Sequence, residues 1–215
     1  KYNNEESLQE IKATVQLEKD GSLKAKLSIV SKGLQFDDKY HFENFSKEKL
    51  IKRYKSRTWN YNNNLEIESV NLKNDKENIV FNEDLKININ NYASVTDEEY
   101  LFRVNIFNKE SYVPKRYRKR KLPLKIARGY KDVDEYIFKL PEGYKLDVLP
   151  FLKEINTKFG AYKVSFTKID ETSFKYQKSI LIKEGVYPKE DYKLYRSFRR
   201  SIAKYGNLRI AIIKE

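Results

Sequence analysis

Strict alternation of apolar and polar residues on both sides of an Asp-Gly pair most constrains how this chain can fold. Residues 10–30 read EIKATVQLEKDGSLKAKLSIV, with Asp20 and Gly21 at the centre. The apolar face consists of Ile11, Ala13, Val15, Leu17, Leu23, Ala25, Leu27 and Ile29. An Asp-Gly pair between two alternating runs predicts a β-hairpin. One face of this hairpin is expected to cover a core, while the other meets water.

Similar alternation recurs along the chain and predicts a mainly β fold. Further strands are expected within residues 65–72, 78–90 and 134–150, and residues 161–182 predict a second hairpin that turns at 170–173. Because so many half-buried strands need a second layer to cover them, we expect an antiparallel β-sandwich. We assign residues 1–215 to one domain of this type, with a division into two lobes near residues 112–122 as the alternative.

One or two short helices accompany the strands. Ser46 is suited to cap the first helix, which would begin just after it. The second is expected near the C-terminus, with Pro188 at its first position and Gly206 in the left-handed conformation that closes it. Its core-facing stripe is Tyr195, Phe198, Ile202 and Tyr205, and its cations Arg196, Arg199, Arg200 and Lys204 lie largely on other faces. A final strand is expected within residues 208–213.

The residue types that carry most enzyme chemistry are scarce. The 215 residues include no cysteine and a single histidine, His41, which is too few nitrogen and sulfur ligands for a zinc site. We therefore predict no catalytic residue, no cofactor, no metal ligand and no enzymatic activity. Asp132, Asp134 and Glu135 are assigned to solvated strand edges. A hydrolase built on two converging carboxylates is the alternative that coordinates can test.

Nothing in the sequence predicts a membrane span or an export signal, because no run of about 18 apolar residues occurs. The first residue is lysine and the chain contains no methionine. We therefore expect that it begins after processing or was cut from a longer polypeptide.

A dense basic run lies in the middle of the chain, whose formal net charge is +13. Between Pro114 and Pro123 it offers six cations and a tyrosine as candidate polyanion-binding residues, namely Lys115, Arg116, Tyr117, Arg118, Lys119, Arg120 and Lys121. If all six cations contacted phosphates of duplex DNA, the logarithm of affinity would fall with the logarithm of salt with a slope of roughly −5. Tyr117 would be available to stack on a base.

The simpler interpretation of this run is a flexible, solvated connection without a binding function, kept clear of the core by repulsion between its cations. Prolines at both ends discourage regular strand pairing. Neither an RNA-recognition signature nor a helix-turn-helix pattern accompanies the run, which disfavours nucleic acid as the partner. The sequence favours the connection and leaves a polyanion-binding module, for nucleic acid, anionic polysaccharide or lipid headgroups, as the alternative.

Several C-terminal stretches resemble a known family. They read KRKLPLKI, LPEGYKLDVLP, FGAYKVSF and GVYPKEDYKLYRSFRRSIAKYGNLRIAII. In this order they are similar to the domain of unknown function that follows the transglutaminase-like core in exported multidomain bacterial proteins. The likeness covers residues 120–215 well and residues 1–110 more weakly. The positions that match the family are of types expected to form turns, helix caps and the core. They are Leu140, Pro141, Gly143, Tyr144, Pro150, Gly160, Tyr162, Pro188, Tyr192 and Phe198.

The resemblance implies a non-catalytic accessory domain, because the Cys, His and Asp triad of the transglutaminase-like core has no counterpart in this chain. It implies an upstream catalytic domain of the same polypeptide as the partner, and a periplasmic or extracellular location. The density of charge in the basic run departs from the family pattern, which has only a basic residue or two before a proline. A local role for the run therefore stays open.

Overall fold

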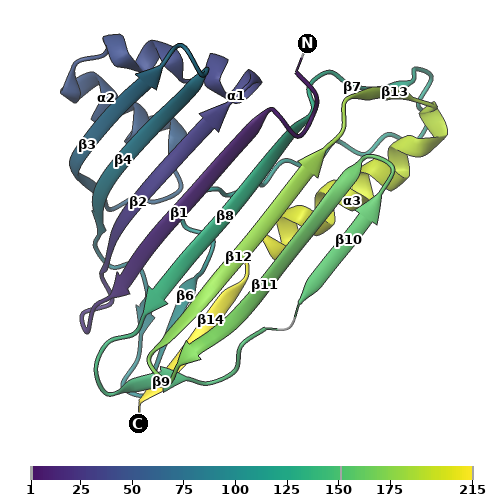
Figure 1. Ribbon diagram of the computed structural model, residues 1–215. Helices are drawn as coiled ribbons and strands as arrows, with labels where there is room; N and C mark the ends of the chain where they lie inside the picture. Colours follow the sequence, from purple (N-terminus) through teal and green to yellow (C-terminus); the bar gives the residue numbers. More distant parts are fainter. Residues whose placement is uncertain (1, 151, 215) are drawn as a thin grey trace.

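A computed structural model describes residues 2–150 and 152–214. Within them the chain is mainly β and forms three sheets with three α-helices (Figure 1). The strands are β1 (Leu8–Leu17), β2 (Leu23–Lys32), β3 (Leu65–Asp75), β4 (Val80–Ile89), β5 (Ser94–Val95), β6 (Glu99–Arg103), β7 (Leu124–Ile126), β8 (Tyr130–Lys139), β9 (Tyr144–Leu146), β10 (Lys153–Thr157), β11 (Gly160–Asp170), β12 (Ser173–Ile182), β13 (Gly185–Tyr187) and β14 (Arg209–Lys214). The helices are α1 (Leu34–Asp37), α2 (Lys47–Arg53) and α3 (Tyr192–Tyr205).

The largest sheet has eight strands in the order β10-β11-β12-β8-β1-β2-β4-β3. All neighbouring strands in it are antiparallel except β1 and β8, which run parallel. Because β8 lies between β1 and β12, strands from both sides of the basic run hydrogen-bond within this one sheet. The parallel pair is a departure from the purely antiparallel arrangement that local alternation predicts.

The first predicted hairpin is confirmed as β1 and β2, which turn at Asp20 and Gly21. Gly21 has a φ of +79°, a conformation that glycine adopts without strain. The Asp20 carboxylate accepts hydrogen bonds from the backbone N–H and the hydroxyl of Ser22 at 2.9 and 2.6 Å. The second predicted hairpin is β11 and β12, with its turn between Asp170 and Ser173 as expected.

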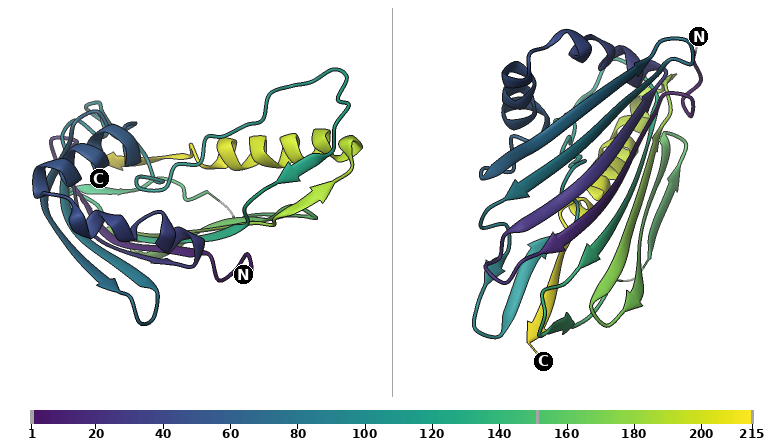
Figure 2. Two further views of the ribbon diagram at one scale, coloured as in Figure 1. Left: turned by 90° about the horizontal axis from the view of Figure 1, so that it is seen from above. Right: turned by 60° about the vertical axis from the view of Figure 1, so that its left-hand side comes forward.

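A second layer covers one face of the large sheet (Figure 2). It consists of α3 and a four-stranded sheet in the order β5-β6-β14-β9, while β13 and β7 form a short separate ribbon. Half-buried strands require such a layer, so the predicted fold class, mainly β with a C-terminal helix and a final strand, is confirmed. The final strand β14 pairs with β6 and β9 of the smaller sheet.

The predicted helix ends are confirmed in part. The Ser46 side chain accepts a hydrogen bond from the backbone N–H of Lys49 and caps α2. Three buried residues, Tyr195, Phe198 and Ile202, form the inward stripe of α3. The left-handed conformation predicted for Gly206 is wrong, because its φ is −66° and it ends α3 in a right-handed conformation. In the part of the chain that the structure describes, no helix is both long and apolar enough to cross a membrane.

Candidate polyanion-binding groove and a buried acidic cluster

The basic run belongs to a long connection, residues 104–123, between β6 and β7. This segment contains neither helix nor strand and runs along α3 on the side turned away from the large sheet (Figure 2). The side chains of the run are mostly exposed, as a solvated connection requires. The segment is nevertheless not clear of the core, because Val104, Ile106, Phe107 and Pro114 are buried. The run itself is exposed and irregular, as the expected connection requires, while the residues that lead into it are anchored in the core.

Side chains of α3 hold the connection in place. The hydroxyl of Tyr192 donates to the carbonyl of Lys115 at 2.7 Å, and Nε of Arg196 donates to the carbonyl of Pro114 at 2.9 Å. The Arg120 guanidinium lies over the Tyr192 ring, 4.2 Å from its centroid. These contacts satisfy backbone carbonyls that a free loop would leave to water.

Between the basic run and α3 lies a hollow of about 1100 Å³, which we call the basic groove. Eight cations and a single acid, Glu190, line it together with Tyr117, Tyr192 and Ser197. The cations are Arg116, Arg118, Lys119, Arg120, Lys189, Lys193, Arg196 and Arg200. Cationic side chains from two separate segments thus converge on one concave surface. Such a surface concentrates anions and can follow the backbone of a charged polymer.

Five of the seven sequence-predicted residues line the basic groove, and two do not. Arg116, Tyr117, Arg118, Lys119 and Arg120 face it, whereas Lys115 and Lys121 are not among its lining residues. The four cations that α3 and the turn before it contribute carry no polyanion signal in the sequence. Spacing around the helix predicts only that they lie away from the core.

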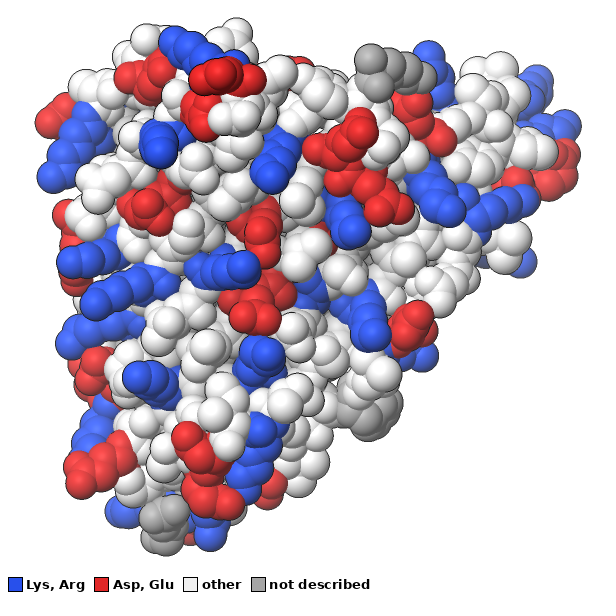
Figure 3. Space-filling view, in the orientation of Figure 1, with Lys and Arg blue, Asp and Glu red and all other residues white. Residues whose placement is uncertain are grey.

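The exposed face of the large sheet has a different charge pattern. Lysine and arginine side chains there are interspersed with aspartate and glutamate (Figure 3). Ion pairs on this face include Lys12 with Glu10 within β1, at 3.1 Å, and Lys175 of β12 with Glu135 of the neighbouring β8, at 3.7 Å. The net positive charge is therefore not spread evenly, and the basic groove holds a dense share of it.

Asp132 and Asp134 are not solvated, contrary to the prediction for this stretch. They are 7% and 1% exposed and project from β8 toward the interior. Lys178, directly opposite Asp134 on β12, is 2% exposed and forms an ion pair with it. We call Asp132, Asp134 and Lys178 the buried acidic cluster. Glu135, on the other face of β8, is half-buried and pairs with Lys175.

Neutral amides cover the buried acidic cluster. The Asn108 side chain donates to Asp132 and Asp134 at 3.1 and 3.2 Å, and the backbone carbonyl of Asn108 accepts from Lys178 at 2.7 Å. Gln35 donates to the other oxygen of Asp132 at 2.8 Å. Burial, together with the charge of Asp134, raises the pKa of Asp132 to about 6. With each acid hydrogen-bonded and hardly exposed, this cluster joins the large sheet to the 104–123 connection and leaves no open face for a substrate.

The signal for this cluster was present in the alternation. Tyr136 and Phe138 of β8 face the core, so Asp132 and Asp134, at the same spacing, must face it too. On β12, Lys178 takes the position between Tyr176 and Ile180. The charge of each acid favours solvent, but its place in the alternation decides the face of the strand on which it lies. Within residues 2–150 and 152–214, no group of three or more histidine, cysteine, aspartate or glutamate side chains is arranged to hold a metal ion.

Comparisons with known proteins point to one family. Residues 97–212, more than half of the chain, match DUF3858, described as a domain of unknown function with a solved structure. No curated protein gives a significant match. A crystal structure of a putative protease from Parabacteroides distasonis ATCC 8503 is similar over 55% of this chain, with 13% identity and a TM-score of 0.42. The match spans about a quarter of that protein, 24% of its chain.

Proposed function

This chain belongs to the DUF3858 family, and from that premise we propose that it is a non-catalytic accessory domain of a transglutaminase-like bacterial envelope protein. The motifs of the C-terminal half support the proposal, because they resemble the segment that follows such a catalytic core. In this proposal the catalytic domain lies upstream in the same polypeptide, outside the cytoplasm. A chain without cysteine is compatible with an oxidising compartment.

The observation that carries this proposal is the state of the buried acidic cluster. A carboxylate hydrolase needs two acids that flank a space for its substrate. Here Asn108 bridges the two carboxylates and Lys178 pairs with one of them. The two carboxylates that a hydrolase would need are therefore bound to neighbouring side chains of the fold, which supports a structural role for them.

We expect the isolated chain to be inactive. Incubated with casein, and separately with a glutamine peptide plus a fluorescent amine, it should release or couple no more product than buffer does. Asp132→Asn should leave that background unchanged. Activity above background that Asp132→Asn abolishes would contradict the proposal, as would a parent gene with no Cys- and His-containing core upstream.

A second function, binding of an anionic polysaccharide, is favoured by the basic groove. Arg116, Arg118, Lys119, Lys193 and Arg200 line it and form no ion pair with any acid in the described part of the chain. The contacts of Tyr192 and Arg196 hold the groove in shape before a ligand arrives, which lowers the entropic cost of binding. An envelope location would present polysaccharides rather than nucleic acid, and no nucleic-acid motif accompanies the run.

We expect labelled heparin to bind in a salt-dependent manner. The triple variant Arg116→Gln, Arg118→Gln, Lys119→Gln should bind more weakly and make the slope of log affinity against log salt shallower by about 2 to 3, at roughly 0.7–0.9 per lost contact. Fluorescence anisotropy at several salt concentrations measures both quantities. Arg120 is kept, because it packs on Tyr192.

The matched control removes equal charge from the exposed face of the large sheet, through Lys26→Gln, Lys86→Gln and Lys139→Gln. It should bind heparin with nearly the slope of the unmodified chain. Equal losses in the two triple variants would show that net charge, not the basic groove, drives binding. Tighter binding of single-stranded DNA or of anionic vesicles than of heparin would overturn the assignment to a polysaccharide.

A further inference from the structure

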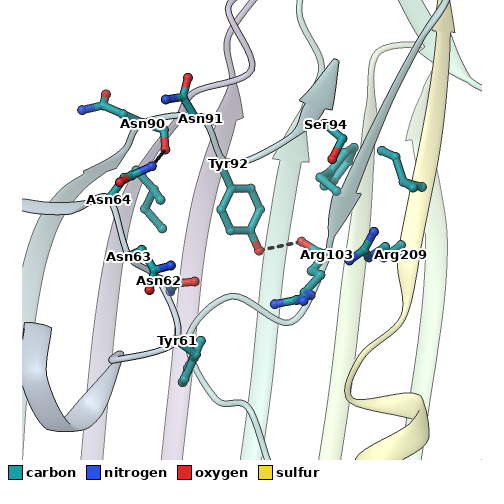
Figure 4. A pocket seen from close by; sticks show the side chains of 13 residues that line it. Tyr61, Asn62, Asn63, Asn64, Asn90, Asn91, Tyr92, Ser94, Arg103 and Arg209 are labelled. Atoms are coloured by element: carbon teal, nitrogen blue, oxygen red, sulfur yellow. Dashed lines mark hydrogen bonds between the residues drawn. The ribbon is translucent and has the colours of Figure 1, made fainter. Parts of the chain in front are cut away.

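A separate pocket lies where two asparagine-rich turns meet the smaller sheet (Figure 4). Its volume is about 220 Å³, and none of its lining residues belongs to the basic groove. The turns before β3 and after β4 contribute five asparagines, Asn62, Asn63, Asn64, Asn90 and Asn91. The facing wall is formed by β6 and β14. No acidic residue lines this pocket.

Two arginines lie side by side on that wall. Arg103 of β6 and Arg209 of β14 are direct partners in the antiparallel register, so their side chains share one face of the sheet. Like charges in this relation are destabilising. Neither guanidinium forms an ion pair with an acid among the residues that the structure describes. The positive field extends to Lys109, whose pKa is lowered by burial and by the charge of Arg103.

An aromatic ring separates the arginines from the amides. The Tyr92 ring stands between the asparagine turns and the arginine pair (Figure 4), and its hydroxyl donates to the carbonyl of Arg103 at 2.9 Å. The Asn64 side chain donates to the carbonyl of Asn90 at 3.0 Å and ties the two turns together. The ring and both turns are thus fixed by contacts of their own.

Two amide side chains in this pocket stay available. Asn63 and Asn91 make no side-chain hydrogen bond within the described residues. Asn91 has a φ of +52°, a left-handed conformation that asparagine tolerates better than most residues. Each carboxamide offers two donor hydrogens and an acceptor oxygen, the combination that an alcohol hydroxyl can use in both directions.

From this arrangement we infer that the pocket binds a carboxylated sugar ring, such as a uronic acid. The arginine pair can bind the carboxylate through two charge-assisted hydrogen bonds, which relieves their mutual repulsion. The free asparagine amides can bind ring hydroxyls, and the Tyr92 ring offers an apolar surface to the C–H face of the sugar. A pocket smaller than a typical drug site is suited to a single ring.

This inference does not depend on the basic groove, and it is tested with monosaccharides rather than polymers. In isothermal titration calorimetry, D-glucuronate should bind the unmodified chain saturably and at least about tenfold more tightly than D-glucose or acetate, because each of those lacks one half of the interaction. Arg209→Gln should weaken glucuronate binding by about tenfold or more. Arg209 is exposed, so this variant is expected to fold.

Two further variants separate this inference from general electrostatics and from misfolding. Arg200→Gln removes the same charge from the basic groove and should leave glucuronate binding unchanged. Asn63→Ala should weaken glucuronate binding while acetate binding stays the same. The inference is overturned if glucuronate does not bind, if acetate binds equally well, or if Arg200→Gln weakens glucuronate binding as much as Arg209→Gln does.

Discussion

Replacing Lys178 with methionine is expected to lower the free energy of unfolding by about 3–5 kcal/mol, because it leaves the Asp134 carboxylate buried without its cation. Both side chains of the pair are almost fully buried, with 1% and 0% exposure. The carbonyl of Asn108 also loses its hydrogen-bond donor. Methionine has a similar volume to the lysine stem, so a cavity contributes little to the loss. Urea denaturation followed by circular dichroism measures the change.

A second substitution tests whether the effect comes from the unpaired charge. The double variant Lys178→Met, Asp134→Leu replaces the pair with apolar side chains and should be more stable than Lys178→Met alone, because no unpaired carboxylate remains at position 134. If the losses of the two single variants simply add in the double variant, the two residues are not coupled and the explanation fails.

The pH dependence of Lys178→Met provides an independent check. Burial raises the pKa values of Asp132 and Asp134 in the folded chain, so the folded state binds protons that the unfolded state has released. Stability contributed by protonating such acids increases as the pH falls. Lys178 lowers both pKa values, so its removal raises them further, and the deficit of Lys178→Met relative to the unmodified chain should therefore shrink as the pH falls below about 7. A deficit that grows as the pH falls would contradict this account.

Local alternation predicted the strands well because it depends on near neighbours. Both hairpins, β1 with β2 and β11 with β12, have turns of a few residues, so each strand finds its partner within its own stretch of sequence. The parallel pairing of β1 with β8 joins Leu8 to Lys131. No period in the sequence encodes a contact over that separation, so this pairing could not be predicted.

The candidate sites were predicted less completely than the strands, for the same physical reason. The basic run stands out in the sequence by its density of cations. Its contact with α3, however, depends on Tyr192 and Arg196, which bond to the carbonyls of Lys115 and Pro114 across 77 and 82 residues of sequence. The pocket of Arg103 and Arg209 depends on the register of β6 against β14. Charge and spacing identify residues that can bind, whereas long-range pairing decides which of them meet.

Arg199 is expected to be the residue on which the position of the basic run depends most. The prediction placed it largely on the exposed side of α3, but it is 4% exposed. It pairs with Glu110 at 2.9 Å, donates to the hydroxyl of Tyr130 at 3.3 Å and lies over the ring of Tyr112. These contacts join α3 to the 104–123 connection just before the basic run begins.

Arg199→Met should therefore destabilise the chain by about 3 kcal/mol, at the low end for a broken buried pair because Glu110 is partly exposed. It should also release the connection locally, so that trypsin cleaves within residues 115–121 faster than in the unmodified chain. Arg199→Lys should restore only part of the stability, since lysine keeps the charge but lacks the planar fork that reaches Glu110 and Tyr130 together.

The adjacent residue provides the matched control for Arg199→Met. Arg200 is exposed on α3 and forms no ion pair in the described part of the chain, so Arg200→Met should change the free energy of unfolding by less than about 0.5 kcal/mol. Its cleavage rate should match that of the unmodified chain. If Arg199→Met and Arg200→Met are equally stable and are cleaved at equal rates, then Arg199 does not anchor the connection. The basic groove would then owe its shape to Tyr192 and Arg196 alone.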